Sequence, residues 1–90
     1  MLEIRYHTKF KKDFKTVLKR GYDIKLLEEV IEMLINNKPL PLKNKDHNLK
    51  GDYSGFRECH ITPDWLLIYK IEENELILSL MRTGTHSDLF

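Results

Sequence analysis

Three of the four histidines lie in segments whose sequence is typical of loops or strand edges rather than of a core: His47, His60 and His86. An imidazole has an ordinary pKa of about 6.5, so a group of imidazoles can supply an acid and a base together near neutral pH. Cleavage of RNA by its own 2′-hydroxyl needs these two proton transfers and no metal. The same histidines could instead be hydrogen-bonded surface residues or packing residues with no role in catalysis. Their spacing alone leaves the catalytic and the structural interpretation open.

Two other kinds of site are less well supported. A metal site would lack the close ligand spacing of HxH or HExxH, and its ligands would be His47, His60, Asp64 and His86. Cys59 is the only cysteine, which excludes an internal disulfide and a multi-cysteine metal site. Its strand position predicts an apolar surrounding, and no serine lies in a nucleophile elbow, so covalent catalysis is disfavoured. We therefore expect no cofactor and no metal.

The N-terminal half is expected to supply one strand and two helices. Alternation of apolar and polar residues predicts a short strand over residues 2–6. Thr8 is expected to cap a helix over residues 9–20, and Gly21 to end it. Asp23 is expected to cap a second helix that runs to about residue 37. Each helix has one apolar stripe, so we expect an antiparallel hairpin. The stripes are Phe10, Phe14, Val17 and Leu18 in the first helix, and Leu26, Leu27, Val30, Ile31 and Leu34 in the second.

The C-terminal half is expected to form an antiparallel meander. Two prolines in residues 38–42 predict a loop of about ten residues. Period-two patterns then predict strands over residues 56–61, 65–71 and 76–82, followed by a polar tail with at most one helical turn. In the first of these strands His60 faces away from Cys59, so it should lie on the face not covered by helices. The order β-α-α-β-β-β predicts an α+β fold, with the helix hairpin on one face of an antiparallel sheet and the other face partly open.

Length and charge limit the function further. The 90 residues are expected to form a single domain, residues 1–90. No apolar run approaches the roughly 20 residues of a membrane span, and no signal peptide is recognisable, so we expect a cytoplasmic protein. A basic run contains a single acid, Asp13, and is typical either of a solvated helix face or of a surface that attracts polyanions. Its cations are Lys9, Lys11, Lys12, Lys15, Lys19 and Arg20.

Three segments together resemble the YafQ branch of the RelE/ParE toxin superfamily over essentially the whole chain. They are residues 47–51 (HNLKG), residues 55–70 (GFRECHITPDWLLIYK) and residues 82–90 (RTGTHSDLF). The resemblance implies a RelE-like fold and a ribosome-dependent mRNA endonuclease. It also implies a cognate antitoxin, DinJ-like and with a ribbon-helix-helix start, as the partner that holds the toxin inactive.

The resemblance also implies roles for individual residues. His47, His60, Asp64 and His86 would form the acid/base cluster, with His86 as the general acid for the 5′-oxygen; the identity of the general base stays open among the other three. Arg82 would stabilise charge on the scissile phosphate. Trp65 and Phe90 would contact or orient the nucleotide; the alternatives are core packing for Trp65 and a frayed terminus for Phe90. Ribosomal RNA phosphates would be met by Lys9, Lys11, Lys12, Lys15 and Lys19.

Two alternatives share the fold. A ParE-like toxin that binds and poisons DNA gyrase would not need the cluster of histidines and aspartate. An inactive member could act only with its antitoxin in transcriptional repression.

Overall fold

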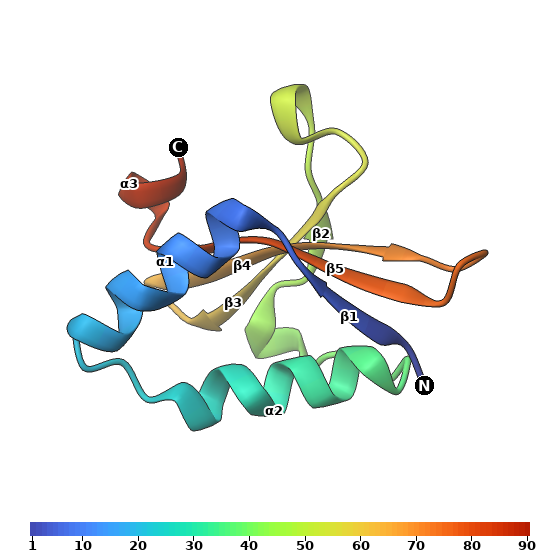
Figure 1. Cartoon of the computed structure of the whole chain (residues 1–90), viewed down its shortest axis with the longest axis horizontal. Helices are drawn as coiled ribbons and strands as arrows, with labels where there is room; N and C mark the ends of the chain where they lie inside the picture. Colours follow the sequence, from blue (N-terminus) through green and yellow to red (C-terminus); the bar gives the residue numbers. More distant parts are fainter.

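The structure is a computed structural model that describes residues 1–90. Three helices and a five-stranded sheet make up the fold (Figure 1). The strands are β1 (Glu3–Tyr6), β2 (His47–Asn48), β3 (Arg57–Thr62), β4 (Trp65–Glu72) and β5 (Ile77–Gly84). The helices are α1 (Thr8–Lys19), α2 (Ile24–Ile35) and the single turn α3 (His86–Leu89). The α+β class and the element order are as expected, with β2 and α3 added.

The sheet is mixed, with the strand order β1-β5-β4-β3-β2. Strands β2 to β5 pair antiparallel, as expected for the meander, whereas β1 runs parallel to β5. The expectation of a wholly antiparallel sheet is therefore wrong at this one edge. Parallel neighbours need a long crossover, and here everything between β1 and β5 serves as that connection.

The helix ends follow local chemistry, with one exception. Gly21 has a φ of +78° and its N–H donates to the carbonyl of Leu18, while the next N–H donates to Val17, which is the expected glycine stop. Asp23 caps α2 by accepting the N–H of Lys25 at 3.1 Å. The expected cap at Thr8 is wrong. Thr8 is the first residue of α1, and the capping residue before it makes no side-chain bond.

The main core lies between the helices and one face of the sheet. Leu18 does not join it and is 49% exposed, because it lies at the rim of the apolar stripe. On the opposite face a second, smaller cluster forms around Leu66, Ile68 and Leu89, under α3 and the segment that precedes β3. The other face of the sheet is thus partly covered, as expected. No helix has the length and apolar character needed to cross a membrane.

The segment expected as a loop contains the short strand β2 and two 3₁₀ turns, Leu42–Asn44 and Gly51–Tyr53. Strand β2 pairs His47 with Glu58 and Asn48 with Arg57. Two residues are too few for a period-two pattern to be visible, so this strand has no sequence signature.

Candidate functional site

The centre of the site is a buried glutamate between two of the expected histidines. Glu58, on β3, is 6% exposed. Its Oε1 lies 3.6 Å from Nε2 of His47 on β2 and 3.8 Å from Nε2 of His60, two residues along β3. The other ring nitrogens face backbone carbonyls, Nδ1 of His47 lying 2.7 Å from that of Lys45 and Nδ1 of His60 lying 3.3 Å from that of Pro63. These contacts fix the orientation of both imidazoles around one carboxylate.

A second network, joined to the same strands, holds the β2 segment in place. Arg57 donates to Oδ2 of Asp46 at 3.0 Å and to Oδ1 of Asn48 at 2.7 Å, while the buried Tyr69 hydroxyl donates to Asp46. Burial, followed by the bond to Asp46, raises the pKa of Tyr69 well above its usual range, so the phenol stays a donor. Because Asp46 directly precedes His47, this network fixes the register of the histidine against the sheet.

Arg82 lies on the same sheet face as Glu58, but its guanidinium is already engaged. The register pairs Glu58 with Ile68 and Ile68 with Arg82, so the two residues are two strand spacings, or about 10 Å, apart. Asp13 on α1 accepts from Nε of Arg82 at 2.7 Å and from Nη2 at 3.1 Å. These bonds are the main reason that the pKa of Arg82 lies above its usual range. The one acid of the basic run therefore orients the arginine.

The C-terminal turn places His86 beside an open groove. Its ring stacks on Phe90, with centroids 4.9 Å apart, and Phe90 meets Tyr53 edge-on at 5.7 Å. Tyr53 and Phe90 line a groove of about 510 Å³ together with Lys9 and Lys50. Phe90 packs against these two rings and is 55% exposed, so it still offers a free aromatic surface. A groove with cations and open aromatic rings suits a single-stranded RNA, whose phosphates meet lysines and whose bases stack.

Two expected site residues lie elsewhere. Trp65 is 2% exposed in the main core, its indole N–H donates to Oγ1 of Thr83 at 2.8 Å, and Tyr22 packs edge-on against it at 5.0 Å. Because the ring is buried in the core, it does not offer a surface to the nucleotide in this arrangement, and the expected role in orienting the nucleotide stays a prediction. Asp64 is exposed in the β3–β4 turn and lines a separate hollow with Tyr22. No hydrogen bond or ion pair joins it to His60.

The basic helix divides its lysines between two surfaces. Lys9 lines the groove beside Phe90, whereas Lys11 and Lys15 line an apolar groove between α1 and α2. All five lysines of the helix, including Lys12 and Lys19, are exposed. Their role toward RNA stays a prediction.

Cys59 is fully buried, as its strand position predicted. Burial raises the pKa of its thiol to about 12, so almost no thiolate exists at neutral pH. This excludes it as a nucleophile in the folded protein.

Sequence reasoning missed Glu58, Asp13 and Tyr53. Strand alternation could have found Glu58, because it is two residues before His60 and so shares its face. Asp13 could have been found because it is the only acid in the basic run. No sequence pattern points to Tyr53, since its position depends on its contact with Phe90, which is distant in sequence.

Comparison with known proteins identifies this chain as a toxin of a type II toxin–antitoxin system. A family model described as a bacterial toxin of a type II toxin–antitoxin system, YafQ, matches residues 2–90. The "mRNA interferase toxin YafQ" of Escherichia coli strain K12 is 44% identical over 89 residues, which cover 98% of this chain and 95% of that protein. The chain therefore belongs to the YafQ toxin family.

Solved structures of related toxins superpose on this chain over its full length. A metal-bound toxin from Helicobacter pylori has a TM-score of 0.94 at 50% identity, with each chain covered completely. YafQ in a crystal structure of the E. coli DinJ–YafQ complex has a TM-score of 0.90 at 43% identity, covering 100% of this chain and 99% of that one.

Proposed function

We propose that this toxin is a ribosome-dependent mRNA endoribonuclease that cleaves by acid/base chemistry without a metal. The observation that carries the proposal is that the sheet face with paired imidazoles around Glu58 also bears Arg82, and that the adjoining groove is lined by Phe90, against which His86 stacks. The name mRNA interferase of the 44% identical E. coli relative supports the same reaction.

The cleavage proceeds in one displacement at phosphorus. A base from the group His47, His60 and Asp64 takes the proton of the 2′-hydroxyl, and that oxygen forms the new bond to phosphorus. The bond to the 5′-oxygen breaks, and His86 gives that oxygen its proton. Arg82 stabilises the charge that develops on the phosphate oxygens. The products are a free 5′-hydroxyl and a 2′,3′-cyclic phosphate. Water then attacks the cyclic phosphate, the bond from phosphorus to the 2′-oxygen breaks and that oxygen takes a proton, which leaves a 3′-phosphate.

In this proposal the residues have graded roles. Glu58 positions the two imidazoles, because its carboxylate lies within 4 Å of both. Asp64 is the weaker candidate for the base, since no contact joins it to either histidine. The ribosome supplies a high local concentration of mRNA and the splayed geometry that an in-line attack needs, so isolated RNA is a poor substrate. The exposed lysines of α1 contact ribosomal RNA phosphates without reading sequence.

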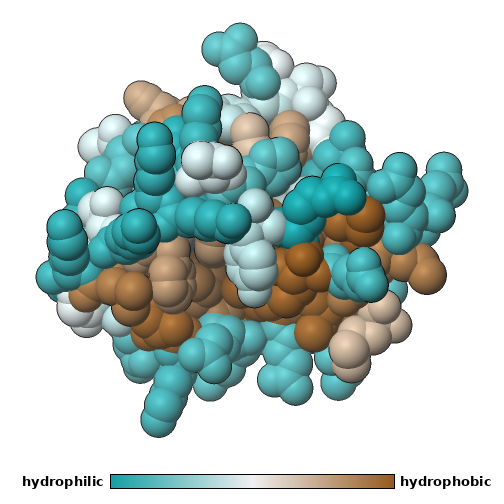
Figure 2. Space-filling view, viewed as in Figure 1, coloured by the Kyte–Doolittle hydropathy of each residue, from teal (hydrophilic) through white to brown (hydrophobic).

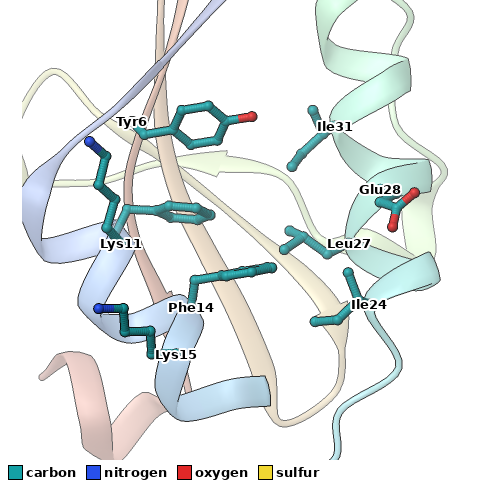
Figure 3. Close-up of a pocket in the computed structure, with 9 residues that line it drawn as sticks. Tyr6, Lys11, Phe14, Lys15, Ile24, Leu27, Glu28 and Ile31 are labelled. Atoms are coloured by element: carbon teal, nitrogen blue, oxygen red, sulfur yellow. The ribbon is translucent and has the colours of Figure 1, made fainter. Parts of the chain in front are cut away.

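In this proposal the partner that restrains the toxin is a cognate antitoxin, DinJ-like and with a ribbon-helix-helix start. The E. coli DinJ–YafQ toxin–antitoxin complex supports the DinJ-like partner. The structure offers it an apolar groove of about 480 Å³ between α1 and α2. In Figure 3, Phe14 of α1 points toward Leu27 and Ile24 across this groove, with Lys11 and Lys15 on the α1 side. Figure 2 shows a hydrophobic band between the hydrophilic side chains of the two helices.

The groove fits an antitoxin segment with apolar residues on one face and acidic residues toward α1. Such a segment is disordered when alone and folds as it binds, which lets a small partner cover a large surface.

The test is cleavage of mRNA on translating ribosomes, mapped by primer extension, with purified His86→Ala. We expect a loss of 10²–10⁴-fold, the usual worth of a general acid, with an unchanged fold because the side chain is exposed. Ser87→Ala, the exposed neighbour in the same turn, is the matched control and should cleave like wild type. EDTA at a concentration that leaves ribosomes assembled should not stop the wild type. Unchanged cutting by His86→Ala would remove His86 from the mechanism.

A further inference from the structure

The C-terminal turn that carries His86 is too short to be stable by itself. Helix α3 has four residues, and helices this short are unfavourable in isolation. The proposed acid therefore depends on whatever tethers the turn. Leu89 provides one tether, since it is 6% exposed against Leu66 and Ile68. The edge-on contact of Phe90 with Tyr53 adds to this apolar anchor, but apolar contacts of this kind lack the directionality of hydrogen bonds.

A second tether is directional. Arg20, directly after α1, donates to Asp88 through two parallel bonds, with Nη1 2.6 Å from Oδ2 and Nη2 3.0 Å from Oδ1. Oδ2 of Asp88 also accepts the N–H of Thr85 at 2.8 Å, and Oγ1 of Thr85 accepts the N–H of Asp88 at 3.2 Å. The carboxylate thus joins the capping box of α3 to the end of α1. The pKa of Asp88 lies well below its usual range, mainly because of the bonds from Arg20.

The backbone is shaped around the same carboxylate. Gly84 has a φ of +153°, and a Cβ on it would lie 2.8 Å from Oδ2 of Asp88. The chain therefore needs a glycine there for Asp88 to reach both Thr85 and Arg20.

We propose that Arg20 and Asp88 are positioning residues for His86, a pair that sets the orientation of the C-terminal turn and so keeps the imidazole beside Phe90 at the edge of the groove. This inference rests on the proposed function in which His86 is the general acid. An exposed ion pair adds little to the stability of a whole domain. Its effect on position is larger, because a displacement of about 1 Å at a reacting group can cost 10²-fold in rate.

The experiment uses Asp88→Asn, Arg20→Gln, the double variant and Arg20→Lys. Single-turnover cleavage at saturating toxin should fall about 10-fold or more in both single variants, while ribosome binding stays unchanged. The double variant should be no slower than either single one, because one interaction is lost in each case. Arg20→Lys should recover part of the rate. Glu73→Gln and Lys25→Gln, which remove exposed charges without side-chain partners, are the matched controls and should behave like wild type.

A measurement independent of cleavage accompanies the rates. Amide order parameters of Leu89 and Phe90 should fall from values typical of rigid backbone, about 0.85, toward less than about 0.6 in Asp88→Asn. Wild-type rates in both single variants, or unchanged order parameters, would overturn the positioning role. A wild-type protein that does not cleave mRNA would instead overturn the proposed function, and the order parameters would still decide whether the pair holds the turn.

Discussion

The indole of Trp65 and the hydroxyl of Thr83 form a buried polar pair whose loss has a calculable effect. Thr83→Val keeps the side-chain shape but leaves the indole N–H without its acceptor, 2.8 Å away in the wild type. An unsatisfied buried donor costs about 1–3 kcal/mol. For a domain of this size, a loss of about 2 kcal/mol lowers Tm by roughly 8–16 °C. This is a large share of the 5–13 kcal/mol or so expected for 90 residues.

The assay is urea unfolding followed by circular dichroism in a double-mutant cycle with Trp65→Phe. The Phe variant removes the N–H, so Thr83→Val should cost at least about 1 kcal/mol less in that background. Thr83→Val also removes the hydrogen bond from the Thr83 hydroxyl to the carbonyl of Leu66. That loss occurs in both backgrounds, so it cancels from the coupling free energy. Additive effects within about 0.5 kcal/mol would refute the reasoning. Both variants should still cleave mRNA below their melting temperatures, and a folded but inactive Trp65→Phe would instead support direct contact with the nucleotide.

Two further predictions concern the charged groups of the site and of α1. Glu58→Gln should slow cleavage without weakening ribosome binding, because it removes the charge within 4 Å of both imidazoles, and equal single-turnover rates would exclude a role for the carboxylate. Replacement of Lys12, Lys15 and Lys19 by Gln should weaken ribosome binding and make its salt dependence shallower by roughly one log–log unit per lost phosphate contact, with cleavage recovering at saturating toxin. If the triple variant co-sediments with ribosomes like wild type at every salt concentration, these lysines do not bind ribosomal RNA and form a solvated helix face.

Local patterns predicted what depends on local geometry. Alternation placed His60 and Cys59 on opposite faces of β3, and the structure confirms this, because the two-residue repeat of a strand is independent of its neighbours. The stop at Gly21 and the cap at Asp23 were visible for the same reason.

What the sequence could not provide is the partner of each side chain across the fold. Arg82 is bound by Asp13, which is distant in sequence, and no periodicity links the two. The burial of Trp65 was not visible either, because the motif that contains it indicates the family and carries no information about burial. The parallel pairing of β1 with β5 was missed, since the direction of an edge strand depends on the path of the long connection between the two strands and not on the sequence of the strand itself.

That pairing has a consequence for the folding of the toxin. Strand β5 lies between β1 and β4, so β1 has no neighbour in the sheet until β5 is in place. Contacts between such distant segments form late, because the loop between them must be closed first. Strand β5 also carries Arg82, so the step that completes the sheet is the step that brings this arginine onto the face of Glu58. A chain in which β5 has not yet docked therefore lacks both the complete sheet and this part of the site.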